Sequence, residues 1–170
     1  MSLSDLCRLC GLCCDGNLFS HVPLQQAEID TARRNGLAVV SLVGDSPAIR
    51  QCCTALRERQ CTVYAQRPER CRRYVCRLLE ARAREELSQE EALAVVERAR
   101  ALLADVERSL APDADPLASV MDRARFADWG GLEESSAQTR AARERAEAFL
   151  DQHFHGGPRR FEAPGGPEVE

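Results

Sequence analysis

The sequence predicts a mainly α-helical protein, built as a small irregular cysteine-cluster domain with short helices, followed by a helical carboxyl-terminal segment. All nine cysteines lie between residues 7 and 76. This part of the chain is short of large apolar residues and rich in turn-forming ones, so something besides a hydrophobic core must hold it together. Beyond it, apolar residues recur every three or four positions, which is typical of amphipathic helices.

Two helices are expected within the first segment. One covers residues 23–35, because Pro23 suits the first position of a helix and Gly36 suits the residue just past its end. The other starts near Pro68, with Glu69 in the first turn where the helix dipole favours an acidic group, and continues through Leu79. This second helix would carry the last two cysteines.

The second segment has a stronger helical pattern. Ser88 and Glu91 have the spacing of a capping box, and the apolar residues that follow form one stripe ending at Pro112. A shorter helix is expected over residues 116–129, between an Asp-Pro start and a Gly-Gly stop. A last helix is expected over residues 136–153.

These expectations divide the chain into three parts. Residues 1–80 form the cysteine-cluster domain, and residues 81–154 form about three helices packed on it. Residues 155–170 contain many Gly and Pro and few apolar groups, so they are expected to be a disordered tail.

Composition and charge limit the kinds of partner and the cellular compartment that we expect for this protein. The net charge of −4 indicates no gross attraction to nucleic acid or to an acidic membrane. The amino terminus lacks the basic flank and apolar run of a signal peptide, and no stretch approaches the roughly 18 apolar residues of a membrane span. We therefore expect a cytoplasmic protein that is not in a membrane. In that reducing compartment the cysteines indicate metal ligation or redox chemistry rather than disulfides.

The run Cys7-x2-Cys10-x2-Cys13-Cys14 is the sharpest motif in the sequence. Two-residue spacings let a turn aim successive thiolates at one centre, and Gly11 permits the positive φ that such turns often need. The same register is found in ferredoxins that bind a [4Fe–4S] cluster. The spacing alone therefore leaves zinc and iron–sulfur both open, and it predicts a metal-stabilised domain in either case.

The adjacent pair Cys13 and Cys14 adds a second indication. Neighbouring side chains point in different directions in most backbone conformations, so the pair suggests two centres close together or one polynuclear centre. Two zinc ions with four ligands each would use eight of the nine cysteines. The alternative is that the cysteines are small buried hydrophobic residues, but four of them within eight positions argue against it.

Several linked motifs resemble one known family. In order and spacing they resemble the bacterial cysteine-cluster family of the YkgJ type (CxxCxxCC), described as a zinc- or iron-chelating domain. The resemblance covers about residues 7–77. The motifs are C-x-x-C-G-x-C-C (Cys7 to Cys14), Cys53-x-x-Leu56, Cys61-x-x-Tyr64 and Arg67-Pro68-x-x-Cys71-Arg72-x-Tyr74-x-Cys76.

The resemblance implies a set of metal ligands. Cys52 has no place in the family pattern, which makes it the spare cysteine, although it could substitute for Cys53. The helical carboxyl-terminal half lies outside the resemblance. The implied ligands are Cys7, Cys10, Cys13, Cys14, Cys53, Cys61, Cys71 and Cys76.

Arginines accompany the cysteines. Residues 50–77 contain eight Arg and only two acidic residues, Glu58 and Glu69. Guanidinium groups would offset the excess negative charge of clustered thiolates and donate hydrogen bonds to sulfur. The candidates are Arg67, Arg72 and Arg73. An RNA- or DNA-binding patch is the alternative, but only two tyrosines are available there for base stacking.

The leading functional interpretation is a metal-binding module that contacts another protein. Zinc, as two ions, is slightly preferred over iron or a [4Fe–4S] cluster, because eight ligands divide into two four-coordinate sites. The alternatives are an iron–sulfur enzyme that carries out redox chemistry or modifies a protein, and a metal-delivery or redox-sensing protein. His21 is a further possible ligand, but a surface or hydrogen-bonded imidazole is the preferred interpretation. The sequence does not settle whether the protein is an enzyme.

Overall fold

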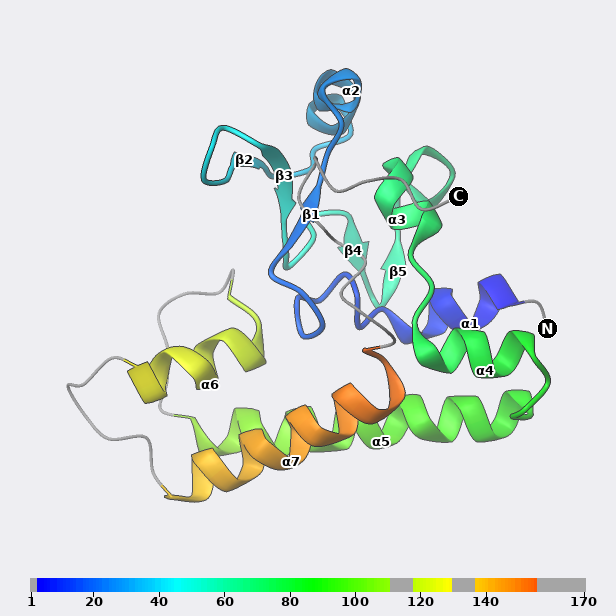
Figure 1. Ribbon diagram of the computed structural model, residues 1–170, viewed down its shortest axis with the longest axis vertical. Coiled ribbons are helices and arrows are strands. Elements are labelled where there is room, and N and C mark those ends of the chain that lie inside the picture. Colours follow the sequence, from blue (N-terminus) through cyan, green and yellow to red (C-terminus); the bar gives the residue numbers. More distant parts are fainter. Residues whose placement is uncertain (1–2, 111–117, 130–136, 156–170) are drawn as a thin grey trace.

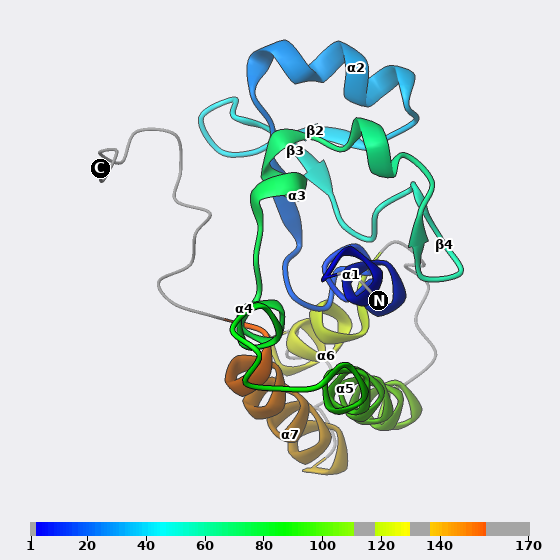
Figure 2. The same ribbon diagram turned by 90° about the vertical axis from the view of Figure 1, so that its right-hand side faces the viewer.

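Helix α1 (Leu3–Cys10) lies at the centre of the protein, between a layer of helices and a layer containing a small sheet (Figures 1 and 2). The computed structural model describes residues 3–110, 118–129 and 137–155. Seven α-helices fall within these ranges, so the prediction of a mainly helical protein is confirmed. The prediction did not include the strands.

The sheet layer is built from three short antiparallel strands in the order β1-β3-β2. Their bounds are β1 (His21–Pro23), β2 (Val39–Ser41) and β3 (Pro47–Arg50). Ile49 on β3 lies opposite Val22 on one side and Val39 on the other, and it is almost fully buried. The predicted helix over residues 23–35 is therefore too long, because Pro23 belongs to β1. Only the 3₁₀ turn η1 (Gln26–Glu28) and helix α2 (Ile29–Arg34) are helical.

The helices and strands in the cysteine-rich stretch after β3 are also shorter than predicted. A hairpin of β4 (Leu56–Arg57) and β5 (Gln60–Cys61) leads through η2 (Tyr64–Gln66) to α3 (Glu69–Arg73) and α4 (Arg77–Ala83). The single helix expected from Pro68 to Leu79 is thus wrong. The chain is extended at Tyr74, whose ring packs edge-on against Phe19 with centroids 4.8 Å apart.

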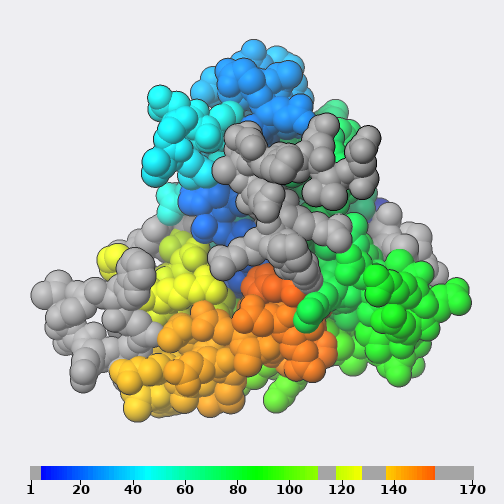
Figure 3. Space-filling view, viewed as in Figure 1, coloured from blue at the N-terminus to red at the C-terminus, as the bar shows by residue number. Residues whose placement is uncertain are grey.

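The helical layer consists of three helices. They are α5 (Gln89–Ser109), α6 (Val120–Trp129) and α7 (Ala137–His153). The capping box predicted from Ser88 and Glu91 is present, with the Glu91 N–H donating to Ser88 Oγ at 3.1 Å. Helices α5 and α7 pack along each other, and α4, α6 and α7 form one continuous surface in the space-filling view (Figure 3).

Some sequence predictions lie outside the described residues. They include residues 116 and 117 of the predicted shorter helix, its Gly-Gly stop, and residues 156–170 of the predicted tail. His155, assigned to that tail, is described and lies close to Leu18, as reported below. In the part of the chain that the structure describes, no helix is long and apolar enough to cross a membrane.

Removing the cap of α5 tests the packing of the helical layer. We expect Ser88→Ala to lower the free energy of unfolding by about 1 kcal/mol, because it leaves a helix N–H without its acceptor. Urea unfolding of the full chain at fixed metal concentration measures this. Ser41→Ala, at an exposed position on β2, is the control and should change stability little. Equal effects of both substitutions would contradict the role of the cap.

Candidate metal centre

A partly open cavity of about 100 Å³ lies between the two layers and is lined by cysteines from both. Apolar and aromatic side chains form most of the remaining wall, including Phe19, Tyr74 and Phe154. Cys52 is not among the lining residues. The cysteines that line the cavity are Cys7, Cys10, Cys13, Cys14, Cys53, Cys61, Cys71 and Cys76.

The first four of these cysteines come from α1 and the turn after it. Cys7 and Cys10 are three residues apart on a helix, and not in a turn as predicted, so they lie on the same face. Gly11 ends the helix with φ of +69°, a conformation that favours glycine. A Cβ at Gly11 would also stand 3.0 Å from the Arg59 carbonyl oxygen. The turn then presents Cys13 and Cys14 in succession.

The other four cysteines come from four separate elements. Cys53 follows β3 and is tied to the first motif, since its N–H donates to the Cys14 carbonyl oxygen at 2.7 Å. Cys61 ends β5 and Cys71 lies on α3. Cys76 stands in the extended segment just before α4, so the last two cysteines are not on one helix as predicted.

Packing assigns five of the eight cysteines to one of two cores. Cys10, Cys13 and Cys76 pack against the buried core of the helical layer. Cys53 and Cys71 pack against the buried core of the sheet layer. The cavity therefore lies on the boundary between these cores.

The electrostatic neighbours of the thiols extend this grouping, with one contact across it, because Cys14 also raises the pKa of Cys13. Burial is the largest cause of the raised pKa of Cys13, and the nearby thiols of Cys76 and Cys10 raise it further. Cys7 is a further neighbour of Cys10 and of Cys76. We call these four the helix-side group: Cys7, Cys10, Cys13 and Cys76.

The remaining four form a second set. Burial also raises the pKa of Cys14, and the thiols that raise it further are Cys53, Cys61 and Cys71. Cys53 and Cys61 act in the same way on Cys71. We call these four the sheet-side group: Cys14, Cys53, Cys61 and Cys71. The adjacent residues Cys13 and Cys14 thus belong to different groups, as the sequence led us to consider.

Burial raises the pKa of seven of these thiols, which favours their protonated form. It raises the pKa of Cys10 and of Cys71 to about 12 and that of Cys76 to about 11. Backbone N–H groups two or three residues further along donate to the sulfur atoms of Cys10, Cys53 and Cys76, which works in the opposite direction. A bound cation would supply the positive charge that the thiolates lack.

Several arginines lie near the thiols, since Arg8, Arg59 and Arg67 line the cavity. Arg67 lowers the pKa of Cys7 and of Cys71, so it acts on both groups, and its guanidinium lies 3.5 Å from the Tyr64 ring centroid. Arg100, on α5, donates to the Cys10 carbonyl oxygen and lowers the pKa of that thiol. The sequence interpretation missed Arg100, because nothing in its local spacing points to the cysteines.

The other candidate arginines lie elsewhere. Arg73 forms a surface ion pair with Glu69 at 3.1 Å, and the neighbouring Arg72 is exposed. Neither lines the cavity, so their assignment next to the thiolates is not supported. His21 also lies outside the cavity, with Nδ1 3.1 Å from Ser20 Oγ. The Cys52 thiol donates to the Asp15 carbonyl oxygen at 2.8 Å.

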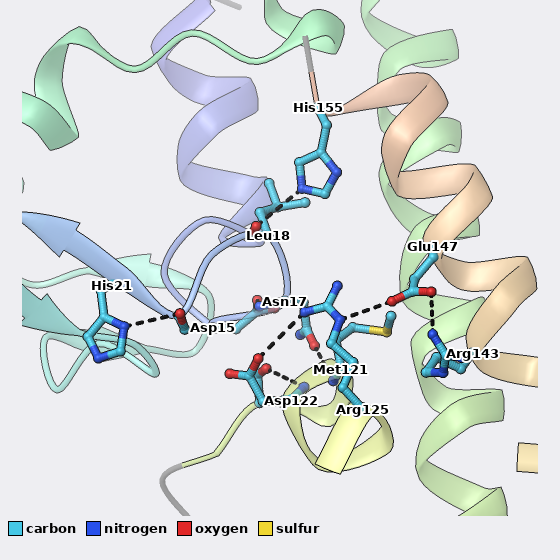
Figure 4. Close-up of polar contacts among 12 residues, drawn as sticks. Asp15, Asn17, Leu18, His21, Met121, Asp122, Arg125, Arg143, Glu147 and His155 are labelled. Atoms are coloured by element: carbon cyan, nitrogen blue, oxygen red, sulfur yellow. Dashed lines mark hydrogen bonds and ion pairs between the residues drawn. The ribbon is translucent and has the colours of Figure 1, made fainter. Parts of the chain in front are cut away.

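The end of α7 closes one wall of the cavity. Phe154 is fully buried there, and its carbonyl oxygen accepts hydrogen bonds from the Arg77 N–H at 3.3 Å and from the Tyr74 hydroxyl at 3.4 Å. His155 Nε2 lies 3.2 Å from the Leu18 carbonyl oxygen (Figure 4). These contacts join the carboxyl-terminal helices to the loop that follows Cys14.

Helix α6 contacts the same loop. The Met121 N–H donates to Oδ1 of the buried Asn17 at 3.3 Å (Figure 4). One turn further along α6, Arg125 pairs with Glu147 of α7 at 2.9 Å. The helical layer is thus connected through polar contacts to the residues just after the first cysteine motif.

The donor chemistry fits a metal. Four cysteine thiolates per group are the ligand set of structural zinc sites and of iron–sulfur clusters. Among the described residues, no group of three or more His, Cys, Asp or Glu side chains is arranged so that it could hold a metal ion. The fit therefore depends on the donor type and on the division into two sets of four.

Comparison with known proteins identifies the family. Residues 6–95, more than half of the chain, match the CxxCxxCC family, described as a "putative zinc- or iron-chelating domain", and the chain belongs to this family. The match confirms the resemblance and extends past residue 77 into α5. No curated protein and no solved structure matches the chain.

The raised thiol pKa values predict how metal binding depends on pH. Each thiol that binds must lose a proton, so affinity should rise with pH, and zinc binding at pH 7 should release about four protons per ion. Zinc titration in weak buffer with a pH indicator measures the release. Cys52→Ser should release as many protons, because Cys52 does not line the cavity. Near-zero release would mean that the thiols are already ionised.

Proposed function

We propose that this protein is a metal-binding module that holds two metal ions, one in each group of four cysteines. The observation that carries the proposal is that the eight cysteines of the family pattern line one cavity, whereas Cys52 does not. The division into two sets of four is our inference from the neighbours of each thiol. Zinc is the preferred metal, because four thiolates around each ion complete a tetrahedral structural site.

The metal would join the two layers of the protein. Three cysteines of the helix-side group pack against the core of the helical layer, and two of the sheet-side group pack against the core of the sheet layer. Because Cys13 and Cys14 are adjacent, the two sites would share a rigid connection. We infer that the module serves as a platform for another protein, with the exposed Arg72 on α3 as part of the contact surface.

An iron–sulfur protein is the second candidate. Two sets of four cysteines are also the donors of [4Fe–4S] clusters, and the first motif has the ferredoxin register. A redox or protein-modifying activity would then be expected instead of a structural role. Metal analysis decides between the two candidates.

Metal content tests the proposal directly. Protein purified without oxygen should contain about two zinc ions per chain and be colourless. Cys14→Ser should reduce this to about one ion, because it removes one ligand from the sheet-side group, and Cys52→Ser should leave about two. Elemental analysis and an absorption spectrum of the same samples provide the measurement. Iron with acid-labile sulfide and a band near roughly 400 nm would favour the iron–sulfur protein.

A further inference from the structure

The two cysteine groups are supported by cores of very different size. Sixteen buried side chains form the core of the helical layer, against which Cys10, Cys13 and Cys76 pack. Six buried side chains form the core of the sheet layer, against which Cys53 and Cys71 pack. Regions with few buried apolar contacts open at a lower free-energy cost than regions with many. The sheet-side group should therefore open more readily.

Cys61 stands on the weakest element of the sheet-side group. The β4–β5 hairpin has two residues in each strand, and an isolated two-stranded hairpin is marginally stable. Its turn residues, Glu58 and Arg59, have φ values of +47° and +71°. This conformation suits Asn and Gly, and other residues adopt it at a cost. Residues 57–60 are exposed.

The base of the hairpin is closed by Thr62, whose N–H and Oγ1 donate to the Ala55 carbonyl oxygen at 2.9 and 3.0 Å. Arg59 holds the turn of the hairpin against the rest of the protein. Arg59 Nε donates to the Leu9 carbonyl oxygen at 3.1 Å, and its Nη2 pairs with Glu97 at 3.0 Å. Both partners of the ion pair are well exposed, with 42% and 61% of their side-chain surface accessible, so the pair adds little stability.

The helix-side group, by contrast, is covered by residues of the carboxyl-terminal helices. Phe154 is fully buried and lines the cavity, and Arg100 donates to the carbonyl oxygen of Cys10. Both residues lie beyond residue 95, outside the part of the chain that matches the family. The carboxyl-terminal helices thus add a wall to the helix-side group.

We propose that the β4–β5 hairpin is a gate for metal exchange, which opens the sheet-side group by withdrawing Cys61 while the helix-side group stays closed. This inference rests on the proposed function, which supplies one ion per group. The partner it fits is a thiol-bearing metal donor or acceptor. Its thiol loses a proton and takes the position that Cys61 vacates, and the Cys61 thiolate takes up a proton. Charge is conserved and no electrons are transferred.

Release kinetics test the gate. The zinc-loaded full chain is mixed with the coloured chelator 4-(2-pyridylazo)resorcinol, with and without free cysteine as the competing thiol. We expect a fast and a slow phase of one ion each, with only the fast phase accelerated by the thiol. Cys61→Ser should remove the fast phase and leave the slow one. A single phase of two ions, or loss of the slow phase in Cys61→Ser, would overturn the gate.

A matched pair of substitutions isolates the strained turn. Glu58→Asn should slow the fast phase about fivefold, because Asn tolerates positive φ and the closed hairpin becomes more stable. Glu85 also has positive φ, +59°, but lies after α4 and does not line the cavity. Glu85→Asn is therefore the control and should leave both phases unchanged. Equal slowing by both substitutions, or by neither, would overturn the gate.

The wall of the helix-side group is tested separately. Phe154→Ala should accelerate only the slow phase, whereas Phe126→Ala, at an exposed position on α6, should change neither phase. Far-UV circular dichroism checks folding, and Phe154→Leu replaces the first variant if it unfolds. Acceleration of the fast phase alone would overturn the assignment of the phases. Fewer than two ions in the unmodified protein would instead overturn the proposed function.

Discussion

The gathering of eight cysteines around one largely apolar cavity is the constraint on which the rest of the structure depends. A thiol in an apolar cavity resists ionisation, and neighbouring thiols make ionisation harder still. Eight thiolates around two divalent ions would keep an excess of four negative charges, which Arg67 and Arg100 offset in part. The cavity is thus suited to thiolates only when cations share it.

This constraint joins metal binding to folding. A structural zinc site contributes about 10 to 16 kcal/mol of apparent binding free energy at neutral pH. A domain is usually stable by only about 5 to 15 kcal/mol. The sheet layer, with six buried side chains in its core, has little else to stabilise it. We expect folding of the sheet layer and binding of metal to be a single equilibrium. Helices α5 and α7 differ, because they retain an apolar contact with each other.

Sequence patterns predicted the long elements well and the short ones poorly. Helix α5 was predictable because its capping box and apolar stripe are local features over some twenty residues. The strands have two to four residues each, too few for an alternating pattern to stand out. Pro23 was misread for the same reason, since a proline at the end of a strand and one at the start of a helix look alike without knowledge of the partner strand.

The sequence by itself determined the chemistry of the site. Clustered cysteines, the adjacent pair Cys13 and Cys14, and the family pattern named the donors and suggested two centres. Only the tertiary structure decided that these cysteines line one cavity, that the Arg100 guanidinium donates to the Cys10 carbonyl oxygen, and that Phe154 forms part of the wall. Those features depend on contacts between residues many tens of positions apart. Local spacing carries no information about such contacts, because only the folding of the chain brings the partners together.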